Sequence, residues 1–428
     1  MKVAHVLLDA HIQGYVEVFK KNMNAGDVLV VSPGKELSAQ YEAILGKQLT
    51  AKRDALGDLK VLGHQFKSLT ADAAFHSDVD AFIQRVYSIL CQGMSLSFQD
   101  NSLSLFLNGQ LVYVCSQCVA SLLGTARVID GRDLILCESF NGLPMIDWTL
   151  TERNITALTS DAVTVVGGAY GRKVTGETID LGKHSSELTA NIIGAILHAE
   201  VVRFYVKDFE YSESSSLSYE EAAQCFSGGV PIYPPAMLPA RNAGVALEVA
   251  DLDNDGIVFV TVSANHEQEV VRGISGVFAS EPMSLVTVYG TGLLGSVGIS
   301  SVIFDRLAKK GINIHFISQS LSEYSISFAV KRMKESLAED VLKALIDDKA
   351  QSRLFDLSYT TRPVGILSVY GQGMRNIPGI SGKIYTALGN EGINVVAASQ
   401  GGEELSISIV VEEKDAERAK AALLALKQ

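Results

Sequence analysis

The chain has 428 residues, enough for two or three domains that each bury a substantial core. Its 47% hydrophobic and 20% charged residues are typical of a soluble globular protein, and its net charge of −12 argues against binding to nucleic acid. We expect no apolar run of about 20 residues, the length that spans a bilayer, and the N-terminus reads as a strand instead of a signal peptide. These features predict a cytoplasmic protein.

The first 260 residues alternate between short β-rich runs and segments with helical spacing of apolar residues. We predict strands at 27–33, 108–115, 126–131 and 162–171, and helices near 35–47, 75–96, 187–199 and 218–226. This alternation predicts an α/β domain.

Five cysteines fit a cytoplasmic protein: Cys91, Cys115, Cys118, Cys137 and Cys225. Cys115 and Cys118 form a CxxC pair, but no second pair follows to complete the four ligands of a zinc site. The pair lies in the apolar stretch LVYVCSQCVASLLG, where thiols behave as small hydrophobic groups. We therefore predict core cysteines and no metal site, with redox or metal chemistry as the alternative.

The C-terminal part contains an ungapped repeat in which residues 286–330 match residues 367–411 at an offset of 81. The segment SQSLSEYSISFAV at 318–330 returns as SQGGEELSISIVV at 399–411. Each copy predicts the order β-α-β-β-α-β, with a glycine-rich turn between the first strand and the first helix. Such a turn exposes backbone N–H groups that suit an anionic ligand group.

This repeated unit resembles the ACT domain, a small regulatory module that binds free amino acids. The amino-acid sequences of the two copies are similar to those of the regulatory pair of aspartokinases. They are most similar to those of bifunctional aspartokinase–homoserine dehydrogenases. The resemblance implies an amino-acid-kinase αβα sandwich at 1–262, with a helical insert near 50–100. Two ferredoxin-like ACT units would follow within 263–428, at about 284–346 and 364–428.

The catalytic motifs of that family are altered here. An aspartokinase opens with a strand followed by Lys-Phe-Gly-Gly-Thr-Ser, whose lysine neutralises the transferring phosphoryl group. In this chain His5 takes the place of the lysine, Leu7 and Leu8 replace the two glycines, and Asp9 follows them. Leucine prevents the close backbone approach that glycine allows.

Two further family motifs differ as well. The Gly-Arg-Gly-Gly-Ser-Asp motif has become residues 182–187, in which Lys183, Ser186 and Glu187 keep the polarity but lose the bidentate arginine. The Arg-Gly-Glu motif that grips the substrate's amino group has become Asn108, Gly109 and Gln110, which removes a charge. The remnant catalytic positions are therefore His5, Gln110, Lys183, Ser186 and Glu187.

The nucleotide motifs depart furthest from the family. The aspartate-glycine turn of the family is absent from 205–216, and Val230 and Pro235 replace a lysine and an arginine. The sequence therefore predicts a catalytically impaired regulatory homologue that needs no cofactor. The alternatives are an active aspartate kinase that uses ATP and magnesium, and a kinase fold that performs other chemistry.

The resemblance also implies positions for an amino-acid effector. In the first ACT unit these are Ser296, Gly298, Asn313, His315 and Gln319, and in the second they are Asn376, Pro378, Asn394 and Gln400. Lysine-sensing relatives carry an aspartate where this chain has His315, so threonine is favoured over lysine. The implied partners are a second copy bound through the ACT units, or a separate catalytic aspartokinase or homoserine dehydrogenase.

Overall fold

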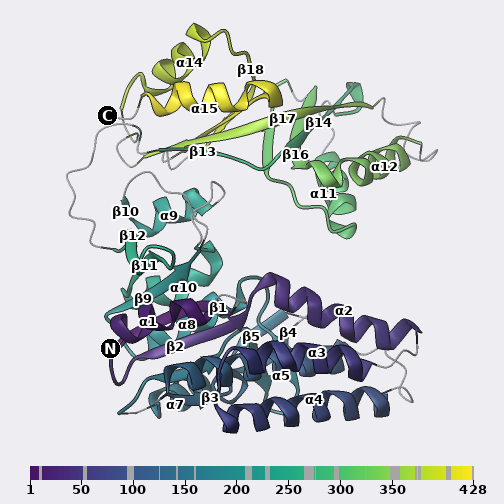
Figure 1. The fold of residues 1–428 in the computed structure, drawn as a ribbon. Helices are drawn as coiled ribbons and strands as arrows, with labels where there is room; N and C mark the ends of the chain where they lie inside the picture. Colours follow the sequence, from purple (N-terminus) through teal and green to yellow (C-terminus); the bar gives the residue numbers. More distant parts are fainter. Residues whose placement is uncertain are drawn as a thin grey trace. The chain divides into compact units, whose positions relative to one another are not determined.

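The structure is a computed structural model. It describes residues 1–8, 12–51, 55–93, 101–124, 126–140, 143–158, 161–207, 215–226, 232–264, 274, 276–293, 298–322, 324–347, 357–371, 374, 377–401 and 406–426. The chain divides into two compact units, one of residues 1–223 with 231–266 and the other of residues 267–428 with 224–230. Figure 1 labels their helices and strands. We call them the N-terminal unit and the C-terminal unit.

The N-terminal unit is built on an eight-stranded sheet of order β10-β12-β11-β9-β1-β2-β6-β3. All neighbouring strands are parallel except β11 and β12. Central strands that are buried on both faces need continuous apolar runs, as in the VLVV segment of β2. The strands are β1 (Lys2–Leu8), β2 (Val28–Pro33), β3 (Arg127–Ile129), β6 (Thr164–Gly167), β9 (Val201–Val206), β10 (Ser215–Leu217), β11 (Ala246–Asp251) and β12 (Ile257–Val262).

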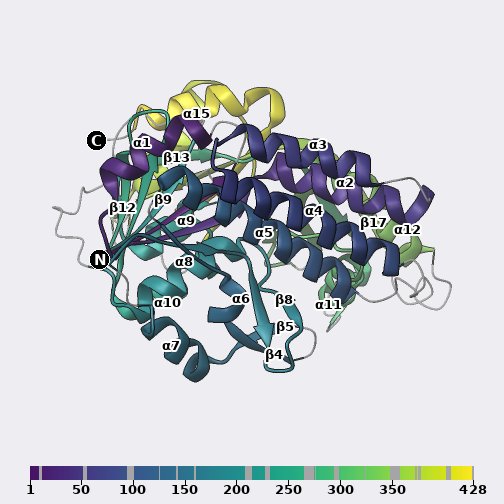
Figure 2. The same ribbon diagram turned by 60° about the horizontal axis from the view of Figure 1, so that its bottom comes forward.

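Helices cover both faces of this sheet (Figure 2). One face shares a hydrophobic core with α1 (Ile12–Asn22), α2 (Lys35–Ala51), α3 (Ala55–Ser68), α4 (Ala73–Gly93) and α5 (Asn101–Leu123). The other face carries α8 (Ser185–Ile196), which packs so closely that a Cβ atom on Gly194 would lie 2.3 Å from Val202. Helix α10 (Pro234–Ala243) packs on α8. Since the sheet lies between two layers of helices, the unit is an αβα sandwich, as predicted.

The remaining elements of this unit are α6 (Gly131–Leu134), α7 (Trp148–Thr156), α9 (Tyr219–Cys225) and a small second sheet of order β5-β4-β7-β8. Its strands are β4 (Leu136–Phe140), β5 (Leu143–Ile146), β7 (Tyr170–Lys173) and β8 (Thr178–Asp180).

The predicted strand at 108–115 is wrong, because these residues lie inside helix α5. Among the described residues, α5 alone is long and apolar enough to cross a membrane by length and composition, so the expectation that no such run exists is also wrong. Most of that stretch is buried in the core that it shares with α4 and β2. Hydrophobic periodicity cannot separate a strand from a helix when a segment is buried on all sides.

The predicted core position of the CxxC pair is confirmed, since Cys115 and Cys118 lie on α5 with no exposed surface. Burial raises the pKa of both thiols, that of Cys118 to about 12. Thiols with raised pKa values remain protonated and are poor nucleophiles and ligands at neutral pH.

The C-terminal unit contains an antiparallel sheet of order β15-β16-β14-β17-β19-β18, with β13 also paired to β17. The strands are β13 (Gly276–Ala279), β14 (Met283–Tyr289), β15 (Phe316–Gln319), β16 (Ser325–Lys331), β17 (Ser358–Tyr370), β18 (Val395–Gln400) and β19 (Ser406–Glu412). The helices are η2 (Thr291–Leu293), α11 (Ile299–Lys309), η3 (Arg332–Lys334), α12 (Glu335–Ile346), α14 (Ile380–Asn390), η5 (Glu413–Asp415) and α15 (Ala416–Leu424).

The elements of this unit follow the sequence repeat. We call residues 283–346 the first repeat and residues 364–424 the second repeat. The bounds of α11 and α14, and those of β16 and β19, differ by the offset of 81. The first helix of each repeat begins after a glycine with a positive φ, 91° at Gly298 and 88° at Gly379. Residues other than glycine rarely adopt this backbone conformation.

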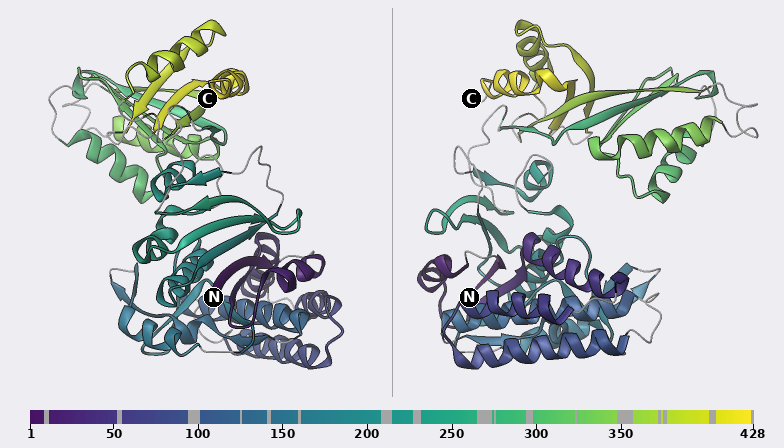
Figure 3. Two further views of the ribbon diagram at one scale, coloured as in Figure 1. Left: turned by 90° about the vertical axis from the view of Figure 1, so that its left-hand side faces the viewer. Right: turned by 45° about the vertical axis from the view of Figure 1, so that its right-hand side comes forward.

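Strand β17 serves both repeats, as Figure 3 shows in its right-hand view. Residues 358–364 pair with β14 of the first repeat, and residues 364–370 pair with β19 of the second repeat. Strand β13, which precedes the first repeat in the chain, pairs with the second-repeat half of β17. The helices of each repeat cover one face in separate hydrophobic cores, and a third cluster joins the repeats on the helix-free face.

Candidate functional site

His5 lies in the middle of β1, between Val30 of β2 and Phe204 of β9. It is 4% exposed, and its Nε2 atom lies 2.9 Å from the hydroxyl of Ser186 in the first turn of α8. Burial lowers the pKa of His5 to about 4, although the nearby Glu187 carboxylate acts in the opposite direction. His5 is therefore uncharged at neutral pH.

The carboxylate of Glu187 is held by two neighbours. Its Oε1 atom lies 2.7 Å from Nδ1 of His184, and its Oε2 atom accepts a hydrogen bond of 3.1 Å from the backbone N–H of Tyr233. The rings of His184 and Tyr233 are stacked with their centroids 4.5 Å apart. Both carboxylate oxygens of Glu187 thus have partners within the protein.

The turn between β6 and β7 packs directly against these residues. A Cβ atom on Gly168 would lie 2.8 Å from Val30 and 3.0 Å from the Cβ atom of Ser186, so only glycine fits there. The next residue, Ala169, has a φ of 86°, and its N–H donates to the hydroxyl of Thr189 on α8 at 3.3 Å. The glycine turn and the start of α8 therefore form one tightly packed site.

The other remnant positions have different surroundings. Lys183 is exposed one residue before the N-cap of α8. Gln110 is buried on α5, where its side-chain oxygen accepts a hydrogen bond of 3.0 Å from Arg85 of α4. The structure thus brings His5, Ser186 and Glu187 together and places Gln110 in contact with another helix.

Sequence reasoning missed Arg132, whose guanidinium lies over Gly109. A Cβ atom on Gly109 would be 2.7 Å from Nη1 of Arg132. Nε of Arg132 donates to both carboxylate oxygens of Asp130, at 2.9 and 3.0 Å. The spacing Asp-x-Arg in IDGRD is the only sequence signal of this pair, and it does not reveal that α5 lies beneath it.

The described effector candidates of the first repeat lie before and after helix α11 and on strand β15. Gly298 precedes α11, and Asn313, His315 and Gln319 lie on or before the edge strand β15 with exposed side chains. Nδ2 of Asn313 and Nε2 of His315 are 3.4 Å apart.

In the second repeat Asn394 and Gln400 match Asn313 and Gln319, and Pro378 directly precedes Gly379, the counterpart of Gly298. Pro378, Asn394 and Gln400 are also exposed. Ser296 and Asn376 lie outside the described residues, as do Asp9, Val230 and most of 205–216. Of the altered motif residues that are described, Leu7 is exposed, Leu8 is buried and Pro235 lies in the first turn of α10.

Comparison with known proteins finds a matching family model and several similar proteins. Residues 286–346 and 367–425 each match the ACT domain family. A bifunctional aspartokinase/homoserine dehydrogenase of Haemophilus influenzae is 28% identical over 271 residues, which are 60% of this chain and 33% of that protein. An aspartokinase of Bacillus sp. strain MGA3 is 29% identical over 288 residues, which are 64% of this chain and 68% of that protein.

The fold has a counterpart among solved structures. Aspartokinase III of E. coli, solved in complex with lysine and aspartate, covers 100% of both chains with a TM-score of 0.80 at 16% identity, which shows the fold alone. The chain spans about a third of the length of the bifunctional relative from Haemophilus influenzae. By sequence and fold, the chain is related to the aspartokinase family and carries two ACT domains.

Proposed function

We propose that this protein is a catalytically impaired regulatory homologue of aspartokinase that senses an amino acid through its ACT pair. The observation that carries the proposal is the state of His5. It occupies the position where the family resemblance places a phosphate-neutralising lysine, yet it is buried, uncharged and hydrogen-bonded to Ser186. A neutral imidazole cannot supply the positive charge that stabilises a transferring phosphoryl group.

Glu187 supports the same proposal. Both of its carboxylate oxygens already contact His184 and the Tyr233 backbone, and the His184–Tyr233 stack lies beside the first turn of α8. A magnesium-bound triphosphate needs nearby cations and carboxylates that are available for the metal. The residues at this site do not fit such a group, so we expect no bound nucleotide.

The ACT pair supports the sensing function. Both repeats keep the positive-φ glycine before the first helix, and both keep an exposed asparagine and glutamine, at Asn313 and Gln319 and at Asn394 and Gln400. A backbone turn with exposed N–H groups suits an α-carboxylate, and amide side chains suit an uncharged ligand. We favour threonine over lysine because the imidazole of His315 does not attract an ammonium group as a carboxylate would.

The test is an assay of aspartate phosphorylation with ATP and magnesium, in which hydroxylamine traps the acyl phosphate as the hydroxamate. We expect no product above the no-enzyme control, even at high enzyme concentration. The Bacillus aspartokinase assayed in parallel is the positive control. Turnover in the range of about 1–100 per second that is typical of kinases would overturn the proposal and favour an active aspartate kinase.

A further inference from the structure

The two repeats are related by a pseudo-two-fold axis that passes between β14 and β17. In this antiparallel pair Met283 lies opposite Val364, and the two residues are themselves separated by 81 positions. Two counterparts that face each other in an antiparallel pair must lie on either side of the symmetry axis that relates the copies. The axis therefore crosses the sheet between Met283 and Val364.

A second pair of counterparts meets near this axis. Nη2 of Arg332, the first residue of η3, donates a hydrogen bond of 3.0 Å to Oε2 of Glu413, the first residue of η5. These residues are also 81 positions apart. The same Nη2 atom lies 3.4 Å from the carbonyl oxygen of Met283, so the guanidinium contacts the residue that marks the axis.

Arg332 also faces a carboxylate of its own repeat. Its Nε atom lies 3.6 Å from Oε2 of Glu335 and is buried without a hydrogen-bond partner. The same Oε2 atom of Glu335 accepts a hydrogen bond from the hydroxyl of Ser284, which has no exposed surface. The resulting chain of contacts runs from Ser284 in β14 through Glu335 and Arg332 to Glu413 in the second repeat.

The second repeat has no equivalent of this chain. The counterparts of Ser284 and Glu335 are Gly365 and Ala416, which pack directly against each other. The counterpart of Arg332 is Glu413 itself, its ion-pair partner. A single guanidinium at the axis therefore serves two carboxylates, one from each repeat.

We propose that Arg332 couples the two repeats, so that local opening of either repeat is transmitted to the other through the Arg332–Glu413 ion pair. Without the guanidinium, Glu335 and Glu413 lose the cation that they share, and like charges near one axis repel. Coupling between two sites is reciprocal, so a change on the Glu413 side must be felt in the first repeat. If the ACT pair senses an amino acid as proposed above, this ion pair is a route by which one repeat responds to a ligand on the other.

Amide hydrogen exchange of the full chain, without any ligand, tests the coupling. Arg332→Ala is expected to raise exchange in α12 and in the second-repeat segment of β19 and α15, by about two- to five-fold, the scale of a partly exposed ion pair. Glu413→Ala is expected to raise exchange in the same two regions.

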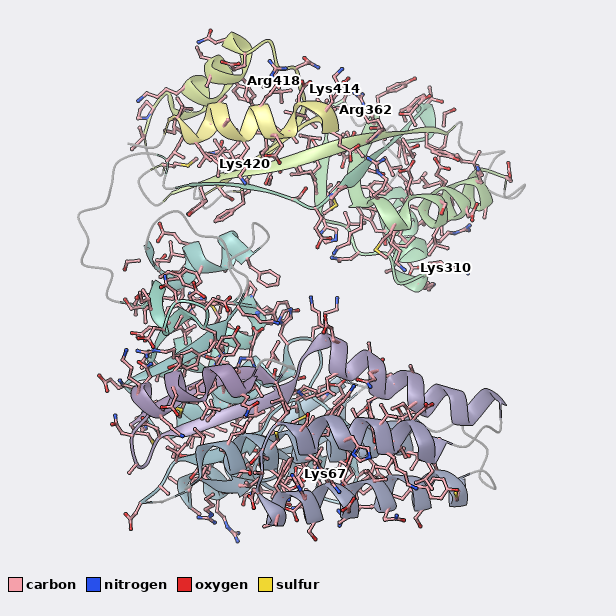
Figure 4. The ribbon with its side chains drawn as sticks, viewed as in Figure 1. Lys67, Lys310, Arg362, Lys414, Arg418 and Lys420 are labelled. Carbon is pink, nitrogen blue, oxygen red and sulfur yellow. The ribbon has the colours of Figure 1, made fainter. Side chains whose placement is uncertain are left out.

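The matched control is Lys414→Ala. Lys414, labelled in Figure 4, directly follows Glu413 but pairs with Glu412 of its own repeat at 2.7 Å. This variant is expected to leave α12 unchanged. Exchange that rises only in α12 for Arg332→Ala, or only in α15 for Glu413→Ala, would overturn the coupling.

A second variant covers the case in which Arg332→Ala does not fold. Arg332→Lys keeps the charge but loses the fork that reaches both repeats, so we expect a smaller rise in both regions. A rise confined to one repeat would again overturn the coupling. Because no amino acid is present, neither result depends on whether the protein senses one.

Discussion

Gly365 of β17 lies so close to Ala416 of α15 that a Cβ atom on Gly365 would be 2.6 Å from the Cβ atom of Ala416. The backbone of Gly365 is not in the left-handed region, so the close approach of α15, and not φ, requires glycine there. In the first repeat the same two places hold Ser284 and Glu335, which are joined by a hydrogen bond. The repeats therefore attach their last helices to the sheet by different means.

The first prediction follows from this contact. Gly365→Ala is expected to destabilise the C-terminal unit by about 1–3 kcal/mol, because a methyl group in this space forces strand and helix apart. Gly382→Ala is the control, since Gly382 lies on α14 and a methyl group added there would have nothing within 4 Å. Alanine is the better helix former by up to about 1 kcal/mol, so the control should be neutral or stabilised. Urea unfolding measures both, and equal stability of the two variants would contradict the assigned contact.

The second prediction concerns acid and His5. Its pKa is about 4 in the folded chain, against an ordinary value of 6.5, so between these pH values the unfolded chain binds a proton that the folded chain excludes. Stability is therefore expected to fall as pH drops from about 6.5 to 4, by up to about 3 kcal/mol from this group alone.

His5→Gln should remove that contribution, because glutamine does not titrate and still offers a hydrogen-bonding group to Ser186. As pH falls through this range, the unfolding free energy of the original chain should fall more steeply than that of the variant. His64→Gln, the same substitution at an exposed site on α3, is the matched control. Parallel profiles for the original chain and His5→Gln would show that His5 is not buried in its neutral form.

The third prediction concerns the effector. Calorimetric titration with threonine, lysine and methionine is expected to show binding of threonine, and Gln319→Ala is expected to weaken it by about tenfold, the cost of one or two lost hydrogen bonds. Gln400→Ala tests the matching place in the second repeat. If none of the three amino acids binds at millimolar concentration, the sensing function is wrong. Unchanged binding in Gln319→Ala would show that the first-repeat site is misplaced.

The fourth prediction concerns assembly. Among the described pairings, β15 and β18 each have one strand neighbour, so each has one side without a hydrogen-bonded strand. Uncovered edges tend to pair with another chain, and we expect a dimer whose interface includes both repeats. Light scattering at micromolar concentration should give twice the mass of the 45.9 kDa chain. A monomer under these conditions would rule out that interface.

The first five elements of each ACT unit could be predicted from the sequence, whereas part of the N-terminal unit could not. The final strand predicted for the second copy is wrong within the described residues, because β13 from before the first repeat pairs with the second half of β17 instead. An ungapped repeat fixes strand and helix order twice, so errors in one copy are corrected by the other. Residues 108–115 had no such second copy, and a segment that is buried on all sides gives no period to distinguish β from α. The fold class survived this error because the neighbouring strands and helices were correctly placed.

The candidate site was predicted only as a set of altered residue types. That His5 replaces a lysine is visible in the sequence, but its neutrality depends on burial and on a hydroxyl 181 positions away in the chain. Likewise, the repeat reveals that Arg332 and Glu413 are counterparts, but only the folded sheet shows that they touch. The type of each residue can be read from the sequence, whereas the charge state of a buried group depends on the tertiary structure around it.

The pairing of β13 with the second half of β17 has a consequence for how this region can be divided. Strand β13 comes before the first repeat in the chain, yet it pairs with the second-repeat half of β17. In chain order the first repeat is therefore an insertion between β13 and the rest of the second repeat. No single cut of the polypeptide releases either repeat with its full complement of strands. A fragment that starts at residue 283 loses β13, where the ring of Tyr370 closes over Gly276. A fragment that ends at residue 346 loses β17, one of the two strands that pair with β14. A proteolytic cut, a gene fusion or a truncation within this region therefore affects the strand pairing of both repeats together.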